Sequence, residues 1–388
     1  MERHYGLDWL RIGAFGLLIL YHVGMVFVPW GFHVKLPGDF LLTLPMLAVN
    51  PWRLSLLFVV SGYASRALLM RSEGLGAFAR DRSVRLLAPL LFGMLVVVPP
   101  QPWVELVTKH GYGQGLAAFW AGDYLGFRPL HGLDLPTWNH LWFVVYLWVY
   151  TLALAFALAL TPASALAAVG RALAWAFRGP AILLLPMAYL ILVDVVLFPG
   201  GRETHALVDD PVAHASYLPA FLLGFALGRA PHVLRWLGRR WLPCAVVAVA
   251  AYAVVAALQL RFAQAVGFPS PWGHVFSAAR AVQGAASVAA LLGAADRFWN
   301  RDHPRRAILT EAVFPFYLVH QTVIVLVAYW IMPAGLPWPA AMAVLVVATV
   351  AGCWTFYLAG RAIGPLRPLI GLKRRARPSA APLAPAAA

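Results

Sequence analysis

The chain has 388 residues, of which 62% are hydrophobic and only 12% are charged, with a mean hydropathy of +0.74. Soluble domains are about 45–50% apolar and about 25% charged, so the composition excludes a soluble fold of this size. The 22 Phe and 16 Trp exclude a disordered chain, and the two Cys exclude a disulfide scaffold. We therefore expect an all-α polytopic membrane protein, because helices satisfy their own backbone hydrogen bonds in lipid.

The net charge of +15 comes from basic residues that lie between the apolar runs. Basic residues in such places set membrane orientation and contact anionic lipid head groups, so we expect the lipid bilayer as a partner and no nucleic acid. Cys244 and Cys353 fall at or in apolar segments and are expected to be small core residues.

Ten apolar segments are predicted to span the membrane as helices. They cover residues 12–29, 54–70, 86–103, 140–160, 181–198, 216–230, 241–259, 274–295, 314–332 and 338–359. Residues 40–49 and 116–127 are too short to span, so we expect interfacial or re-entrant pieces there. No small-residue cleavage site follows the first segment, so we expect that segment to be retained rather than removed as a signal peptide.

The distribution of basic residues predicts the orientation. With the N-terminus inside and the segments alternating, 23 Arg and Lys fall in inside segments and 6 fall in outside segments. Cytoplasmic loops carry such an excess, so we expect both termini in the cytoplasm and the loop 104–139 outside. Residues 1–375 would form one transmembrane domain, and the Ala/Pro-rich tail 376–388 is predicted to be disordered.

Ionisable residues inside the first segment are candidates for function, because polar groups are costly in a membrane. His22 lies about ten residues into this segment, which places it near the membrane midplane. Arg11 precedes it by eleven residues, so both project from nearly the same helix face, roughly 16 Å apart along the axis. A core histidine and a boundary arginine would be the structural alternative.

Arg82 and Arg85 stand one helical turn apart at the inner end of the third segment. On a helix they form a cationic fork, and guanidinium forks suit phosphate groups. The alternative is that both are ordinary topology charges.

Further candidate substrate-binding residues lie in or beside later spans, namely Arg53, His140, Trp142, Arg280 and His320. Trp142 sits where an aromatic anchor at the membrane interface is common. Arg280 and Asp194 are intramembrane charges that either form a buried pair or meet a ligand. The sequence contains no HExxH, Walker or Cys/His zinc spacing, so no metal site is expected.

Several stretches resemble the membrane acyltransferase-3 family over about residues 3–370. They read RHYGLDWLRIGAFGLLILYH, RLSLLFVVSGY, RDRSVRLLAP, NHLWFVVYLW, SYLPAFLLGFALG and FPFYLVHQ. The family pattern Arg-x10-His is matched by Arg11 and His22, and its Arg-x-x-Arg pattern by Arg82 and Arg85. Within the family the chain looks most like the glucan biosynthesis protein C branch, which is linked to O-succinylation of periplasmic glucans.

The resemblance implies an acyltransferase-3 type transmembrane domain that transfers groups other than aminoacyl groups. An acyl group, succinyl or acetyl, would pass from cytoplasmic acyl-CoA to a hydroxyl of an extracytoplasmic glycan or glucan, across a bacterial cytoplasmic (inner) membrane. The CoA phosphates would meet Arg82, Arg85 and Arg11, with acyl-CoA as co-substrate and no permanently bound cofactor. His22 would act as a base, a group that orients the thioester, or an acyl carrier.

Two other classes of function stay open at the level of the sequence. One is a transporter of an acyl group or small anion, with His22 as a proton relay. The other is a non-catalytic scaffold for glycan synthesis. The sequence also leaves the oligomeric state open, including a homo-oligomer.

Overall fold

The computed structural model of this protein describes residues 3–263, 265 and 267–374, so the predicted tail 376–388 lies outside the described residues. Within that part of the chain every regular element is a helix, and extended pairing is limited to one isolated bridge between Leu130 and Leu133. The helical interpretation of the composition is confirmed.

Eight helical runs are long and apolar enough to cross a membrane, and they coincide with eight of the ten predicted segments. They are α1 (Tyr5–Met25), α2 (Thr43–Leu69) with the short 3-10 turn Phe40–Leu42 before it, α3 (Leu75–Phe92) continuing into α4 (Pro100–His110), α6 (Trp142–Leu160), α10 (Pro231–Arg261), α11 (Trp272–Phe298), α12 (Pro304–Ile331) and α13 (Trp338–Ala362). The chain is a multi-pass membrane protein.

The other two predicted segments are helical in the structure but do not form long straight spans. Segment 181–198 corresponds to α8 (Ala181–Ile191) and a π-helical turn (Leu192–Leu197), which bend by 97° from the preceding α7 (Ala163–Ala176). Segment 216–230 overlaps α9 (Pro211–Leu227), which has 17 residues. The remaining short helices are α5 (Leu116–Phe119) and α14 (Leu366–Leu369).

Residues 40–49 form the first turns of a spanning helix, so the expectation of a separate interfacial or re-entrant piece is wrong. Pro45 falls in the first turn of α2, where a backbone N–H has no helical partner to lose. Pro51 lies inside the helix and leaves the Leu47 carbonyl without its usual donor. Gln283 of α11 supplies that donor, since its Nε2 lies 3.1 Å from the Leu47 oxygen.

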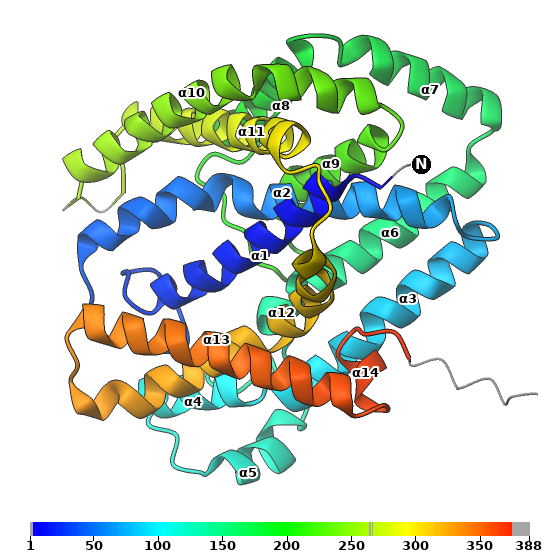
Figure 1. Cartoon of the computed structure of the whole chain (residues 1–388). Coiled ribbons are helices and arrows are strands. Elements are labelled where there is room, and N and C mark those ends of the chain that lie inside the picture. Colours follow the sequence, from blue (N-terminus) through cyan, green and yellow to red (C-terminus); the bar gives the residue numbers. More distant parts are fainter. Residues whose placement is uncertain (1–2, 264, 266, 375–388) are drawn as a thin grey trace, which may run out of the picture.

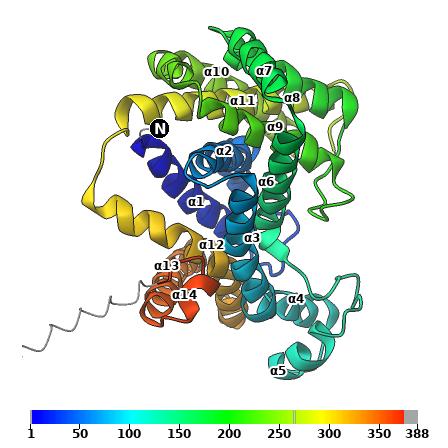
Figure 2. The ribbon, with the colours of Figure 1, turned by 90° about the vertical axis from the view of Figure 1, so that its right-hand side faces the viewer.

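Helix α2 runs through the middle of the bundle, with α1 on one side and α9 on another (Figures 1 and 2). Gly62 of α2 faces the backbone of α9, and Gly224 of α9 faces the backbone of α2, each leaving no room for a Cβ atom. Small residues allow helix backbones to approach closely in a membrane, where packing takes the place of the hydrophobic effect. The two helices therefore form one closely packed unit.

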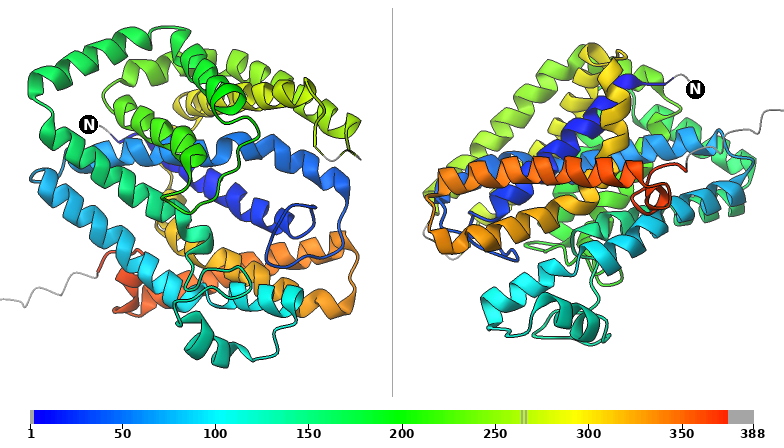
Figure 3. Two further views of the ribbon diagram at one scale, coloured as in Figure 1. Left: turned by 180° about the vertical axis from the view of Figure 1, so that it is seen from behind. Right: turned by 60° about the horizontal axis from the view of Figure 1, so that its bottom comes forward.

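Both ends of the described chain lie on the same side of the bundle, at the right of Figure 1, together with the turn between α2 and α3. The connections after α1 and after α12 lie at the opposite end. This arrangement is the one expected if both termini face the cytoplasm. Figure 3 shows α5, in the loop predicted to be external, projecting from the bundle beside α4.

Candidate active site

His22 on α1 and His320 on α12 form a hydrogen-bonded pair, with 2.9 Å between His22 Nδ1 and His320 Nε2. His320 Nδ1 lies 2.8 Å from the carbonyl oxygen of Tyr317, and a carbonyl only accepts. His320 Nδ1 therefore carries the hydrogen, and its Nε2 accepts one from His22 Nδ1. The hydrogen-bond partners thus assign the tautomer in which His22 Nε2 keeps a free lone pair.

His22 lines a cavity of about 840 Å³ that reaches the loop end of the bundle. Residues of three connections, 31–33, 137–139 and 200–205, lie around it, and these connections lie at the predicted external end of their helices. His22 Nε2 has no hydrogen-bond partner among the residues that the structure describes. His22 Nε2 can therefore accept a proton from a ligand bound in the cavity.

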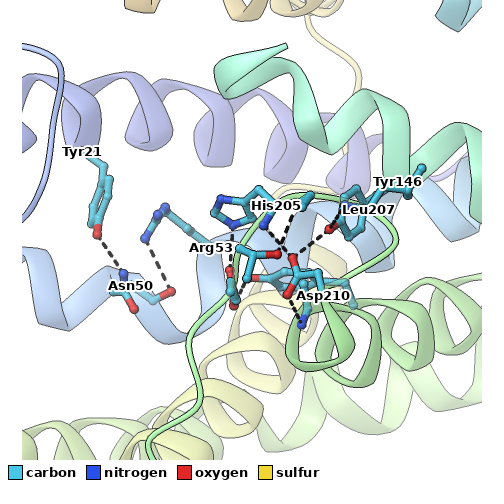
Figure 4. A network of polar contacts seen from close by, with 12 residues as sticks. Tyr21, Asn50, Arg53, Tyr146, His205, Leu207 and Asp210 are labelled. Carbon is cyan, nitrogen blue, oxygen red and sulfur yellow. Dashed lines mark hydrogen bonds and ion pairs between the residues drawn. The ribbon is translucent and has the colours of Figure 1, made fainter. Parts of the chain in front are cut away.

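Two arginines predicted from the sequence, Arg53 and Arg280, lie in the same cavity and both contact Asn50. Figure 4 shows Arg53 beside Asn50 and Tyr21. The Arg53 guanidinium lies 3.4 Å over the Tyr21 ring and 3.5 Å from the Asn50 carbonyl, while its buried Nε has no partner. Arg280 donates to Asn50 Oδ1 at 2.7 Å. Asn50 in turn donates to the Tyr21 hydroxyl at 2.7 Å.

Neither guanidinium has a carboxylate within ion-pair distance in the described part of the chain. Asp194 also lines the cavity, but it stays outside that distance from Arg280, so the two do not form a tight buried pair. Two guanidiniums without an ion pair, one with an unsatisfied N–H, make this part of the cavity suited to an anionic group.

The outer wall of the cavity is aromatic and polar. Trp142 stacks on the His205 ring with 4.0 Å between ring centroids and 12° between planes. His205 Nε2 lies 3.0 Å from one oxygen of Glu203, and the Tyr217 hydroxyl donates to the other at 2.6 Å. Trp142 is only 8% exposed, so the interpretation as an anchor at the membrane surface is wrong, and the side chain lines the cavity instead.

Asp210 holds the loop that carries this wall (Figure 4). Its carboxylate caps α9 through the Ala213 N–H and accepts hydrogen bonds from the Tyr146 hydroxyl and the His205 N–H, at 2.7 and 2.8 Å. Burial alone would raise the pKa of Asp210, but these donors outweigh burial and hold the pKa below its usual range. The charged carboxylate therefore orders the loop.

His140 lines the cavity, but both of its ring nitrogens are engaged. Nε2 donates to the Leu318 carbonyl at 3.2 Å, and Nδ1 faces the Gln101 amide at 3.4 Å. The ring also packs edge-on against His320, with 5.1 Å between centroids. His140 thus packs against His320, which bonds to His22, and His320 does not itself line the cavity.

The three arginines predicted to meet a phosphate lie together but outside the cavity. Arg82 on α3 lies close enough to Arg85 and to Arg11 on α1 for their charges to interact. Nε of Arg11 and Nε of Arg82 are both buried without a hydrogen-bond partner, and Arg85 is exposed. This cluster lies toward the same end of the bundle as the chain termini, and roughly 16 Å of helix separates Arg11 from His22.

Sequence reasoning missed several residues of the cavity. Tyr21, Asn50, Glu203 and His205 belong to it, as does the pair formed by His33 Nδ1 and Glu105 Oε2 at 2.6 Å. The polar run around Glu203 and His205, directly after an apolar segment, was the available signal for the outer wall. Within the described residues no group of three or more His, Cys, Asp and Glu side chains could hold a metal ion.

The chain is similar to proteins named "Glucans biosynthesis protein C" from Escherichia coli K12, from strain O1:K1 and from strain O139:H28, each 29% identical over 151 residues. The matched stretch covers 39% of this chain and only 37% of those relatives' length. No solved structure matches the chain. A family model described as "Acyltransferase domain" matches residues 4–358, which is nearly the whole transmembrane bundle. The chain therefore belongs to this acyltransferase family.

Proposed function

We propose that this protein transfers an acyl group from acyl-CoA to a hydroxyl of an extracytoplasmic glycan or glucan. The observation that carries the proposal is the position of His22, whose free Nε2 faces a cavity open at the loop end. The same helix carries Arg11 into the arginine cluster at the opposite end. One helix thus connects a basic nitrogen with an anion-binding cluster.

The arginine cluster suits the phosphates of CoA. Two of its guanidiniums carry buried N–H groups without a partner, and such groups gain hydrogen bonds when a phosphate arrives. The rest of the CoA arm would extend beside α1 toward His22, a distance of roughly 16 Å along the helix. In the orientation that the basic loops favour, the phosphates stay at the cytoplasmic face of a bacterial inner membrane.

The chemistry at His22 is general base catalysis. The acceptor hydroxyl donates to His22 Nε2, and His22 takes the proton as the hydroxyl oxygen attacks the thioester carbon. A C–O bond forms, the C–S bond breaks, and the CoA thiolate leaves and receives the same proton to become a thiol. His320 Nε2 accepts from His22 Nδ1 throughout, so it orients the ring and stabilises the imidazolium.

The cavity walls support a sugar as acceptor and an anion as part of a substrate. Trp142 and Tyr217 offer aromatic surface, and Glu203 and Asp194 offer carboxylates to sugar hydroxyls. The names of the similar proteins also favour a glucan. A succinyl group would bring a carboxylate to the guanidiniums described above, whereas an acetyl group would not.

The test is transfer by the purified protein. The protein in detergent is given succinyl-CoA or acetyl-CoA with a soluble glucan, and mass spectrometry follows acylation of the glucan while thiol release is measured. We expect thiol release matched by ester formation. Solute movement into liposomes without thioester consumption would indicate a transporter instead, and neither activity would indicate a scaffold.

A further inference from the structure

The connection that follows α1 holds one ammonium group in a cage of three main-chain carbonyls. Lys35 Nζ donates to the carbonyl oxygens of Met25 at 2.5 Å, of Val28, and of Trp30 at 2.8 Å. Met25 ends α1, and Pro29, four residues later, has no N–H to donate to its oxygen. In the described part of the chain these three oxygens accept from no other backbone group. An ammonium has three N–H donors, so Lys35 satisfies all three oxygens at once.

The cage requires a compact cation. An ammonium is a point charge whose three donors spread from one nitrogen, whereas a guanidinium is a flat fork suited to carboxylates and phosphates. The chain has 27 Arg and only three Lys, so arginine supplies its positive charge nearly everywhere else. A cation is also favoured at the C-terminal end of a helix, where the carbonyls point. Lysine at position 35 therefore matches the geometry of the cage.

The cage closes a loop that forms one wall of the cavity. Residues 31–33 line the cavity. Beyond them the chain returns to the end of α1, because the Leu36 N–H donates to the Val26 carbonyl at 3.1 Å. Gly38 then passes so close to Phe27 that a Cβ atom at position 38 would lie 1.9 Å from the Phe27 oxygen. The ammonium reaches across this loop and holds residues 31–33 between two fixed ends.

Two side chains of this wall contact the candidate catalytic groups. The Phe32 ring lies nearly parallel to the His22 ring, at 20° and with 6.4 Å between the ring centroids. A parallel neighbour limits how far the His22 ring can turn, and turning would carry Nε2 away from the cavity. His33 Nε2 accepts from the Gln321 amide at 3.0 Å, and Gln321 directly follows His320 on α12. The loop is thereby joined to the helix that carries the hydrogen-bond partner of His22.

We propose that Lys35 is a positioning residue, whose ammonium in the carbonyl cage holds Phe32 and His33 in place beside His22. Lys35 does not itself line the cavity, so it acts through the loop rather than on a substrate. Without the ammonium, three carbonyl oxygens face one another with no donor, and the loop opens. The inference rests on the proposed function for its effect on the rate, whereas the effect on the loop is independent of the reaction.

The test removes the ammonium and supplies it again from solution, with the full-length protein in phosphatidylcholine nanodiscs. Lys35→Ala empties the cage, and methylammonium carries the same three donors. The variant is purified with methylammonium present, which fills the cage while the protein folds, and the ion is then dialysed away. Tetramethylammonium has the same charge but no N–H and controls for ionic strength. Lys35→Arg keeps a charge that does not fit the cage, and Lys373→Ala, at an exposed position, is the matched control.

Two measurements follow each sample, namely hydrogen exchange of the backbone amides in residues 26–36 and thiol release from acyl-CoA. We expect Lys35→Ala to speed the exchange of the Leu36 amide by about tenfold or more, the factor for losing a charge-assisted hydrogen bond. The kcat should fall by a similar factor, with KM for acyl-CoA unchanged. Methylammonium should restore both values and tetramethylammonium neither. Lys35→Arg should behave like Lys35→Ala, and Lys373→Ala like wild type.

The outcomes separate the cage, its effect on the rate and the reaction. Unchanged exchange in Lys35→Ala, equal rescue by tetramethylammonium, or full activity of Lys35→Arg would overturn the inference and leave the proposed function intact. Exchange restored by methylammonium without recovery of kcat would overturn the positioning role. Absence of thioester consumption by the wild type, with exchange behaving as expected, would instead overturn the proposed function and leave the cage in place.

Discussion

Replacing His320 should test whether it fixes the proton on His22. In His320→Leu the acceptor for His22 Nδ1–H is lost. The His22 ring can then adopt the other tautomer, in which Nε2 carries the hydrogen and cannot act as the base that faces the cavity. A hydrogen bond to a charged group contributes about 1.5–3 kcal/mol, which corresponds to about a 10- to 150-fold loss in kcat. KM for acyl-CoA should not change, because the arginine cluster lies far from His320. Arg82 and Arg85 are on α3, and Arg11 lies roughly three turns before His22 on α1. His320→Gln keeps an accepting oxygen and should recover most of the rate.

The assay is steady-state thiol release and ester formation by purified variants, with His22→Ala as reference. Loss of a general base costs about 10²–10⁴-fold, so His22→Ala should fall below His320→Leu. The double variant should be no worse than His22→Ala, because His320 acts through His22. A His320→Leu rate within threefold of wild type, or His320→Gln as poor as His320→Leu, would refute the assigned tautomer.

Three further predictions concern the donor cluster, the topology and the outer wall. Arg82→Lys with Arg85→Lys should insert normally but weaken acyl-CoA affinity more than tenfold by calorimetry, because an ammonium lacks the guanidinium fork; equal affinities would leave both as topology charges. Gly113→Cys should react with impermeant thiol reagents from the periplasmic side only, and labelling from the cytoplasmic side would contradict the orientation. Asp210→Asn should lower the free energy of unfolding in detergent at pH 7 by about 1.5–3 kcal/mol. The pKa of Asp210 in the folded protein lies below its usual value. The stability difference between wild type and Asp210→Asn should therefore narrow as pH falls through that folded-state pKa, and a difference that stays constant with pH would count against the role of the charge.

The sequence indicated the fold class well, because apolar runs of sufficient length predict spans. The fork at Arg82 and Arg85 stays a prediction from the i, i+3 spacing; the structure buries Nε of Arg82 and leaves Arg85 exposed. That Arg11 joins Arg82 was expected from the family patterns and is seen in the structure. The same local rules failed at residues 40–49, because the Gln283 that supports the helix around Pro51 is more than 230 residues away.

The details of the cavity depend on contacts between distant parts of the chain. His22 and His320 are 298 residues apart, so neither the bond between them nor the resulting tautomer follows from the sequence. Trp142 looked like an interfacial anchor because it begins an apolar segment, but the loop at His205 folds over it. Such placement is decided by loop packing, for which a single sequence carries no periodic signal.

The length of α1 has a consequence for the energetics of the proposed acyl transfer across the membrane. If the charged end of CoA remains at Arg11 while the thioester reaches His22, the nucleotide never leaves its own side of the membrane. Only a small acyl group changes sides, and it does so at the moment of bond exchange rather than by carrier motion. The bundle then needs neither alternating access nor an ion gradient, because the thioester supplies the driving force for vectorial delivery.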